Sequence, residues 1–374
     1  MNCVLVRFGE MGAKSNQVRG KMAKILRQRV QDILDYEDID AKARTIEGRI
    51  LVETKSSDEA AKLISKVPGV SSASPAKKVE NNLEKIKQQI DEIEVGETFG
   101  VRANVAGDRK YNSRDLEVEL GAHVEGKTGA QVDLDNPDTW LRIDLRQEGA
   151  FVFGQKIEGP DGFPVGSEGK LGALISGGID SPVAAYEAMT RGSSITPIYF
   201  FNRPIAAEDH KMRFNAVVNK LKRFHPSKDW EAIIVDMKEV NEKLMDVDRG
   251  RMVLHRKIML EVAERIAEQE NLEGLVTGEA IGQKSSQTPR NLRITAPDIP
   301  VHRPLLTRSK SEITSKAREL GTFEEAKINS ACQTMAPDNP RTRMKESEMD
   351  SLRRKVGYEA LVEKAVESAE KEIV

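Results

Sequence analysis

A short apolar run that ends at two glycines constrains the fold of this chain more than any other stretch. The run, residues 171–175, is followed by Ser-Gly-Gly-Ile-Asp-Ser at 176–181 and by a helix-compatible segment at 182–191. This order predicts a buried parallel strand, a tight turn and a helix N-terminus. Paired glycines let the backbone approach a ligand closely, and the N–H groups at a helix N-terminus attract anions. The stretch therefore predicts a phosphate site.

An ordinary glycine-rich turn between strand and helix is the plainer interpretation of the same hexapeptide. A Walker A loop is excluded, because the nearest candidate, residues 166–171, has the wrong spacing and no serine or threonine after Lys170. The apolar run before the turn and the helical segment after it favour the phosphate site.

Strands and helices alternate after this turn. Strands are expected at 195–201, 232–235 and 275–276, and helices at 207–224 and 251–270. This alternation predicts an α/β fold with a doubly wound parallel sheet. Ligands bind such sheets beyond the carboxyl ends of the strands. The turn, the strand end at Tyr199 and Phe200, and residues 277–279 should therefore meet at one edge.

The first 160 residues predict two further α+β domains. Residues 1–75 read as β-α-β-β-α-β, the order of a ferredoxin-like domain. Residues 76–160 contain a helix, a strand, a second helix and a hairpin, and linkers are expected at 75–78 and 159–164. The remaining residues, 161–374, form the third domain, which is expected to end in a charged helix at 346–374.

Composition narrows the class of protein. The 374 residues are 39% apolar and 32% charged, with a net charge of −2, so an RNA site would have to be a local basic patch. The two cysteines, Cys3 and Cys332, cannot form a disulfide framework or a paired-cysteine metal site. No apolar run is long enough to span a membrane, and the N-terminal run is no signal peptide. We expect a cytoplasmic protein without a membrane partner.

Basic residues gather in two places. No acidic residue occurs between Met11 and Gln31, and a second group surrounds the turn after the strand at 98–105. A solvated helix face and a surface for phosphate backbones both fit this pattern. The candidate RNA-binding residues are Lys14, Arg19, Lys21, Lys24, Arg27, Arg102, Arg109 and Lys110.

Three later stretches carry side chains suited to chemistry. Residues 277–288 are polar and glycine-rich directly after a buried strand. Residues 303–313 place Lys310 at the start of a helix, where the helix dipole disfavours a cation. Residues 330–340 hold Cys332 in a loop rich in turn formers. The plainer interpretations are a polar connection, a solvated lysine and an inert cysteine.

These motifs resemble a known family. The hexapeptide 176–181 is similar to the pyrophosphate loop of the PP-loop ATPases, and residues 99–103 and 141–145 resemble a THUMP domain, an RNA-binding module. Together with residues 251–257, the Gly-Gln-x-x-Ser-Gln-Thr of 282–288, residues 303–310 and the Cys332 loop, they resemble the tRNA 4-thiouridine synthetases of the ThiI family.

The resemblance implies a reaction and a set of site residues. ATP, with Mg²⁺, adenylates O4 of uridine 8 in tRNA and releases pyrophosphate, and sulfur then replaces the adenylated oxygen. Asp180, Lys310 and Cys332 are the catalytic candidates. The implied ATP-binding residues are Leu174, Ile175, Ser176, Gly177, Gly178, Asp180, Ser181, Tyr199, Phe200, Arg256, Gly278 and Gln287.

Two departures from the family pattern leave the sulfur source open. The sequence has no rhodanese-like segment with a second cysteine at its C-terminal end, and no cysteine set for an iron–sulfur cluster, so neither is expected. The donor is then a cysteine desulfurase, a separate rhodanese-type carrier or sulfide. The resemblance also implies a homodimer.

Two other functions remain open at this stage. A PP-loop enzyme could adenylate another RNA base, or it could adenylate a small carboxylate or amide. An enzyme acting on such a small molecule would not need the RNA-binding residues 1–160. An RNA-binding module with a decayed ATPase is the other. The intact hexapeptide, with Lys310 and Cys332, argues against decay.

Overall fold

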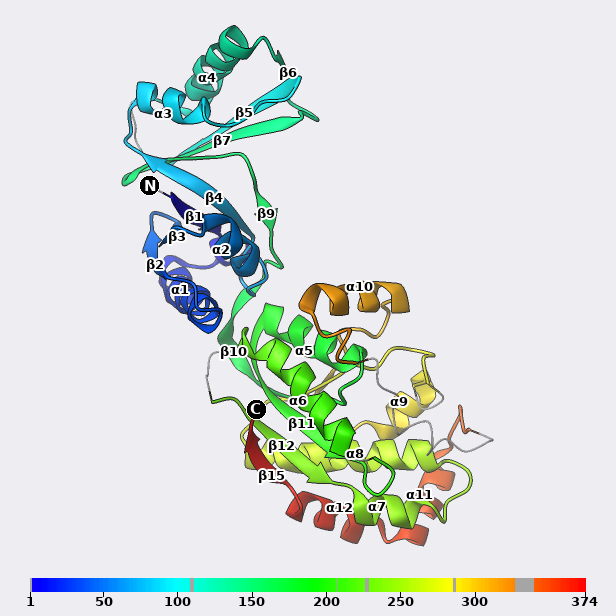
Figure 1. Ribbon diagram of the computed structural model, residues 1–374. Helices are drawn as coiled ribbons and strands as arrows, with labels where there is room; N and C mark the ends of the chain where they lie inside the picture. The colour runs from blue at the N-terminus through cyan, green and yellow to red at the C-terminus, as the bar shows by residue number, and fades with distance from the viewer. Residues whose placement is uncertain (1, 108–110, 207, 226–228, 285–286, 327–339) are drawn as a thin grey trace. The chain divides into compact units, whose positions relative to one another are not determined.

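The computed structural model describes residues 2–107, 111–206, 208–225, 229–284, 287–326 and 340–374. The chain divides into two compact units, Met1–Pro164 and Val165–Val374 (Figure 1). The division falls at the end of the linker expected at 159–164. Among the described residues, no helix is both long enough and apolar enough to cross a membrane.

The first half of the N-terminal unit has the predicted ferredoxin-like order. A single 3-10 turn, Glu10–Ala13, precedes α1. The elements are β1 (Asn2–Arg7), α1 (Asn16–Tyr36), β2 (Ala41–Ile46), β3 (Arg49–Thr54), α2 (Ser57–Ile64) and β4 (Ser72–Val79). The central strand β1 pairs antiparallel with β3 and β4. Its side chains from Cys3 to Val6 are fully buried, so this strand forms the centre of the half.

The second half of the unit continues the same sheet. It contains α3 (Leu83–Ile90), β5 (Thr98–Val105), α4 (Ser113–Thr128), β6 (Gln131–Val132), β7 (Thr139–Arg146), β8 (Gly149–Phe153) and β9 (Ile157–Glu158). The strand order is β2-β3-β1-β4-β8-β7-β5-β6, with β9 beside β4. Side chains of α3 and α4 pack with those of β5, β7 and β8 in one apolar core.

The linker expected at 75–78 is wrong. These residues lie inside β4, which pairs with β1 on one side and with β8 on the other. A proline followed by two lysines is typical of a connection. The pairing of Lys77 with Val152 joins positions too far apart in the sequence for a local pattern to reveal.

The C-terminal unit is an α/β unit with a mostly parallel sheet, which confirms the predicted fold class. It contains β10 (Phe163–Leu174), α5 (Asp180–Thr190), β11 (Arg191–Phe201), α6 (Glu208–Lys222), β12 (Glu231–Asp236), α7 (Lys238–Leu244), α8 (Arg251–Gln269), β13 (Leu275–Thr277), α9 (Pro289–Thr295), β14 (Val301–His302), α10 (Lys310–Leu320), α11 (Glu346–Val356), α12 (Tyr358–Glu367) and β15 (Glu370–Ile373). The strand order is β14-β13-β10-β11-β12-β15. β13 runs parallel to β10 and to β14, and β11 runs parallel to β12.

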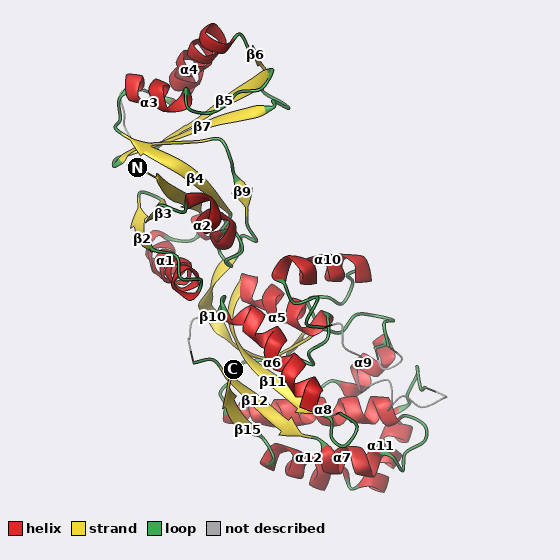
Figure 2. Ribbon diagram, viewed as in Figure 1, coloured by secondary structure: helices red, strands yellow, loops and turns green. Residues whose placement is uncertain are grey.

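Helices cover both faces of this sheet (Figure 2). On one face, Leu174, Ile198 and Phe200 join a core with residues of α7, α8, α11 and α12. On the other face, the ring of Tyr199 stacks on Phe214 of α6, with ring centroids 4.6 Å apart. This alternation along β11 is what a strand buried on both sides requires.

The single charged helix expected at 346–374 is wrong. Gly357 has a left-handed φ of 69° and separates α11 from α12. The last residues form β15, which pairs antiparallel with β12 and is the red strand in Figure 1. Lys371 and Glu372 form ion pairs with Glu270 and Lys211. A charged edge strand and a solvated helix have similar amino-acid compositions, so composition alone did not distinguish a strand from a helix here.

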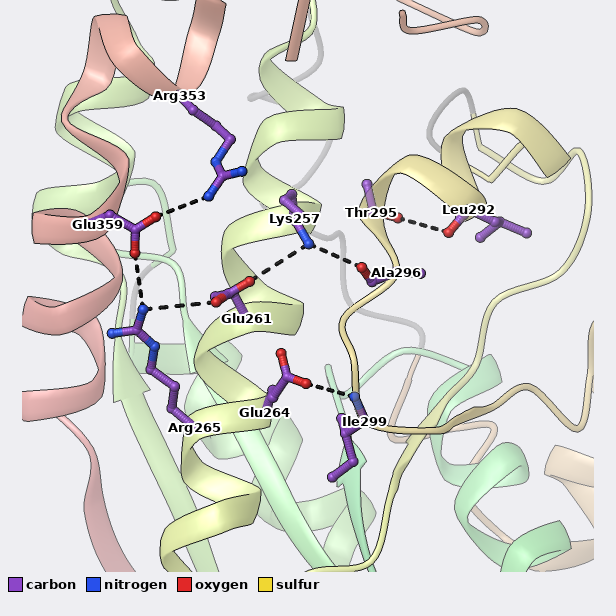
Figure 3. A network of polar contacts seen from close by, with 10 residues as sticks. All are labelled: Lys257, Glu261, Glu264, Arg265, Leu292, Thr295, Ala296, Ile299, Arg353 and Glu359. Carbon is purple, nitrogen blue, oxygen red and sulfur yellow. Dashed lines mark hydrogen bonds and ion pairs between the residues drawn. The ribbon is translucent and has the colours of Figure 1, made fainter. Parts of the chain in front are cut away.

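Polar contacts hold α8 to the segments on either side of it (Figure 3). Lys257 donates to the Ala296 carbonyl at 3.0 Å, and the Ile299 N–H donates to Glu264 at 2.6 Å. At the other side, Arg265 and Arg353 both donate to Glu359, at 3.1 and 3.0 Å. α8 is therefore a fixed support, and four of its residues, among them His255 and Arg256, line the cavity described next.

Candidate nucleotide site

A cavity of about 230 Å³ opens at the carboxyl ends of β10, β11 and β13. Eleven of the twelve ATP-binding candidates line it: Leu174, Ile175, Ser176, Gly178, Asp180, Ser181, Tyr199, Phe200, Arg256, Gly278 and Gln287. The twelfth, Gly177, lies in the turn itself, where its φ is +69°. The structure thus gathers four separate stretches of sequence, 174–181, 199–200, Arg256 and 278–287, around one space at the predicted edge of the sheet.

The glycine-rich turn is closed by its own serines. The Ser176 N–H donates to the Ser181 hydroxyl at 3.0 Å, and the two hydroxyl oxygens are 3.4 Å apart. α5 begins directly after the turn, at Asp180. Asp180 and Ser181 of its first turn line the cavity, and the N–H groups at a helix start, which lack partners within the helix, stabilise an anion together with the helix dipole.

Gly278 lies against this turn more closely than any other residue type allows. A Cβ at this position would lie 2.7 Å from the Ser181 nitrogen and 2.8 Å from the carbonyl carbon of Asp180. These neighbours are backbone atoms, which cannot move aside cheaply. The glycine therefore lets the strand end at β13 pack directly on the start of α5 and complete the cavity.

Lys310 reaches the turn from another part of the unit. Its Nζ lies 2.6 Å from Oδ1 of Asp180, and its side chain is 54% exposed. The residue is the first of α10, as predicted, and Ser309 and Glu312 form a capping box there. Hydrogen bonds from the Ser309 hydroxyl and N–H and from Arg308 lower the pKa of Glu312 to about 2. The capped start of α10 holds Lys310 next to the turn at 176–181, which is the predicted phosphate site.

A neutral histidine also lines the cavity. His255 of α8 is buried, and its Nε2 lies 3.1 Å from Oδ1 of Asn202, which also lines the cavity. Burial, with a smaller contribution from the charge of Arg256, lowers the pKa of His255 to about 4. The ring is therefore uncharged at neutral pH and can take part in hydrogen bonds without adding charge.

The structure also reveals a buried carboxylate that sequence analysis did not single out. Glu279 is 2% exposed and lies between Arg256 and Arg303, at 2.9 and 2.8 Å. Burial alone would raise the pKa of this carboxyl, but the two guanidinium groups outweigh burial and lower it. The sequence signals were its place in the polar stretch 277–288 and the expectation that residues 277–279 lie at the ligand-binding edge of the sheet, neither of which gave Glu279 a role. Arg213 and Lys284 also line the cavity and were likewise missed.

The candidate RNA-binding residues belong to the N-terminal unit. Lys14, Arg19, Lys21 and Lys24 are exposed on or just before α1, whereas Arg27 is half-buried and donates to Gln28. Arg102 of β5 is exposed, with its guanidinium 5.1 Å from the centre of the Trp140 ring.

Three predicted site residues lie outside the described residues. They are Arg109, Lys110 and Cys332. Within the described ranges, no group of three or more histidine, cysteine, aspartate or glutamate side chains is arranged to hold a metal ion.

Three family models match the chain. The model described as thiamine biosynthesis protein (ThiI) matches residues 166–358. The ThiI ferredoxin-like domain matches residues 3–74, and the THUMP domain matches residues 78–154.

Curated relatives and a solved structure match over most of the chain. A probable tRNA sulfurtransferase of Halobacterium salinarum is 37% identical over 350 residues, which cover 91% of this chain and 89% of that protein. A tRNA sulfurtransferase of Thermoplasma volcanium is 32% identical, covering 97% of this chain and 77% of that one. A crystal structure described as a 4-thiouridine synthetase–RNA complex with bound ATP is 30% identical, covers 100% of both chains and has a TM-score of 0.85.

Proposed function

This chain belongs to the ThiI family, and on that premise we propose that it is an ATP-dependent tRNA sulfurtransferase that makes 4-thiouridine. The base modified is uridine 8, and the reaction proceeds by adenylation of its O4. One observation carries the proposal. Eleven of the twelve ATP-binding candidates line a single cavity at a glycine-rich turn, and Lys310 contacts that turn through Asp180.

Different parts of the cavity wall suit the purine ring and the phosphates of ATP. Apolar and aromatic side chains of Leu174, Tyr199 and Phe200 suit a purine ring. Within the described part of the chain, the buried Oε1 of Gln287 has no hydrogen-bond partner, and the buried Nε of Arg256 has an ion pair with Glu279 but no well-aligned hydrogen bond. Buried polar atoms are normally paired, so these two residues favour a polar ligand in the cavity. The N–H groups of the turn then hold the phosphates.

The first step activates a poor leaving group. O4 of uridine attacks the α-phosphorus of ATP, the bond to the β-phosphate oxygen breaks, and N3 loses its proton. The products are pyrophosphate and a base with AMP on O4. Lys310 stabilises the negative charge that develops on the phosphates, and the N–H groups of the turn add to this. Asp180 supplies a carboxylate oxygen of the kind that Mg²⁺ prefers, alongside the phosphates.

The second step exchanges oxygen for sulfur. Hydrosulfide attacks C4, its proton passes to N3, and AMP leaves with the original O4. If Cys332 carries the sulfur as a persulfide, the terminal sulfur attacks C4, and a second thiol must then reduce the S–S bond. We propose a cysteine desulfurase or a rhodanese-type carrier as the protein donor, with sulfide as its chemical substitute.

Residues 1–75 and 76–160, the ferredoxin-like and THUMP domains, bind the tRNA in this proposal, and residues 161–374 carry the adenylation chemistry. Exposed cations of α1 and Arg102 are the proposed contacts with RNA phosphates. The active enzyme is proposed to be a homodimer in the cytoplasm.

A reconstituted reaction tests the function. Purified protein, an unmodified tRNA transcript, ATP, Mg²⁺ and sulfide should give 4-thiouridine at position 8 together with AMP and pyrophosphate. A transcript with cytidine at that position is the control and should remain unmodified. Exchange of pyrophosphate into ATP that depends on a small carboxylate and not on tRNA would instead identify a small-molecule ligase.

A second assay tests the sulfur step. Cys332→Ala should retain activity with sulfide and lose it with a persulfidic donor protein. Cys3→Ala is the matched control, because Cys3 is fully buried, its thiol contacts the Ala76 carbonyl, and burial raises its pKa to about 12. Full activity of Cys332→Ala with the donor protein would remove this cysteine from the mechanism.

A further inference from the structure

We propose that Glu279 is a positioning residue, which holds Arg256 in place for ATP and ties it to the segment that leads to Lys310. The inference rests on the proposed function, since it takes Arg256 to contact the nucleotide. It assigns a specific part to a carboxylate that does not itself need to touch the substrate.

The two oxygens of the Glu279 carboxylate have different contacts. Oε2 accepts hydrogen bonds from the Thr277 hydroxyl at 3.0 Å and from Nε of Arg303 at 2.8 Å. Oε1 lies 2.9 Å from Nε of Arg256, but the N–H is not aligned for a hydrogen bond. Oε2 is thus anchored to the protein, whereas Oε1 restrains Arg256 by charge.

This arrangement leaves Arg256 both localised and available. The residue lines the cavity, and among the described residues its guanidinium has an ion pair with Glu279, while its buried Nε has no well-aligned hydrogen bond. A buried charge pair is strong enough to restrict where the guanidinium lies. Its N–H groups remain to be satisfied by a bound anion or acceptor, so the carboxylate pre-organises the arginine without consuming its donors.

Loss of the carboxylate would leave two guanidinium groups facing each other with no charge between them. Arg256 and Arg303 both have less than a fifth of their side chain exposed, at 18% and 17%. Like charges with little access to water repel strongly. Arg256 would move away, and the cavity would lose its pre-formed shape on this side.

The same carboxylate connects the nucleotide wall to the catalytic lysine. Arg303 starts the short segment that ends at Lys310, and Leu305 within it is buried. The Ile281 N–H donates to the Leu306 carbonyl at 3.0 Å, so the loop after β13 and this segment lie side by side. Movement of Arg303 would therefore reach the start of α10, where Lys310 contacts Asp180.

A double-mutant cycle on ATP affinity tests this role. The dissociation constant of a non-hydrolysable ATP analogue is measured by calorimetry for wild type, Arg256→Gln, Glu279→Gln and the double variant. Each single change should weaken binding about tenfold, the effect of losing one hydrogen bond to a charged group. The dissociation constant of the double variant should exceed that of either single variant by at most about threefold, because both changes remove the same interaction.

Glu264→Gln is the matched control. Glu264 of α8 is likewise a carboxylate that accepts a hydrogen bond within the unit, from the Ile299 N–H, but it does not line the cavity. Its analogue affinity should equal that of wild type. Melting temperatures of all variants separate a change in affinity from a loss of folded protein.

The outcomes distinguish the two proposals. A wild-type protein that does not bind the analogue would contradict the proposed function, and the positioning role with it. Wild-type binding with an unchanged affinity of Glu279→Gln, or with a double variant about a hundredfold weaker, would overturn the positioning role alone. If Glu279→Gln does not fold, Glu279→Asp keeps the charge at a shorter reach and should bind severalfold more weakly. An unchanged affinity in that variant would equally overturn the role.

Discussion

Nζ of Lys310 lies 2.6 Å from Oδ1 of Asp180, although 130 positions separate the two residues in the sequence. The contact joins the N-terminus of α10 to the N-terminus of α5. Two helix starts and a lysine therefore converge where the sequence predicts a phosphate. Asp180 offsets the charge of the lysine in the ligand-free protein, so binding of an anion competes with this ion pair.

We predict that Lys310→Met slows adenylation by about a hundredfold or more, the effect of losing a charge that stabilises the transition state. The analogue dissociation constant should change much less, since the lysine is half exposed and acts on charge that develops during reaction. Pyrophosphate release in single-turnover reactions measures the rate. Lys316→Met, on the same helix and paired with Glu319, is the control and should react normally. A Lys310→Met enzyme as fast as wild type would refute the assignment.

Gly278→Ala should destabilise the C-terminal unit by about 1–3 kcal/mol, because its methyl group would overlap the backbone of α5. Denaturant unfolding gives the free energy. In the control, Gly178→Ala, the nearest contact of the new methyl group would be the Ser176 hydroxyl at 3.4 Å, an ordinary distance. Equal unfolding free energies for the two variants would show that the close packing of Gly278 on the turn does not contribute to stability.

The buried His255 predicts a loss of stability in mild acid. Its pKa is about 4 in the folded chain, against an ordinary 6.5. Between these values the unfolded chain binds a proton that the folded chain does not, so the free energy of unfolding falls as the pH drops from about 6.5 to 4. The total effect is on the order of 3 kcal/mol.

His255→Gln isolates this contribution from that of the acidic residues. The difference between the unfolding free energies of wild type and variant should shrink steadily over that pH range. The measurement is urea unfolding at a series of pH values. Parallel stability profiles for the two proteins would mean that the histidine is not held neutral by burial.

Charge reversal at Lys21, Lys24 and Arg27 should weaken tRNA binding and flatten its dependence on salt. If each residue neutralises one phosphate, the slope of log K against log salt should fall by about two to three. Filter binding over a range of salt concentrations measures it. Reversal of the exposed Lys55, Lys62 and Lys85 gives a control with the same change in net charge. If both triple variants show the same slope, α1 is a solvated helix face that does not contact the tRNA.

Local sequence order accounts for the parts of the fold that were predicted correctly. The apolar run, glycines and helix start at 171–191 each act on neighbouring residues, and ligands bind at strand ends in any doubly wound sheet. These two facts place eleven ATP-binding candidates on one cavity wall. Their contact with ATP stays a prediction, as does the division of residues 1–160 into domains at 1–75 and 76–160.

The parts that sequence analysis missed depend on contacts between distant residues. The pairing of β4 with β8 and of β15 with β12 turns an expected linker and an expected helix into strands. Glu279 is a buried, ion-paired carboxylate because it contacts Arg256 and Arg303, which lie 23 and 24 positions away in the sequence. A glutamate in a polar loop has the same sequence signature whether it is solvated or buried between two arginines.

The fate of the uridine oxygen tests the central claim most directly. A tRNA transcript with ¹⁸O at O4 of uridine 8 is thiolated with ATP, Mg²⁺ and sulfide, and the released AMP is analysed by mass spectrometry. If O4 is adenylated and AMP is then displaced from C4, each AMP should carry one ¹⁸O for each 4-thiouridine formed. Recovery of the label in water, or ADP and phosphate in place of AMP and pyrophosphate, would contradict the account.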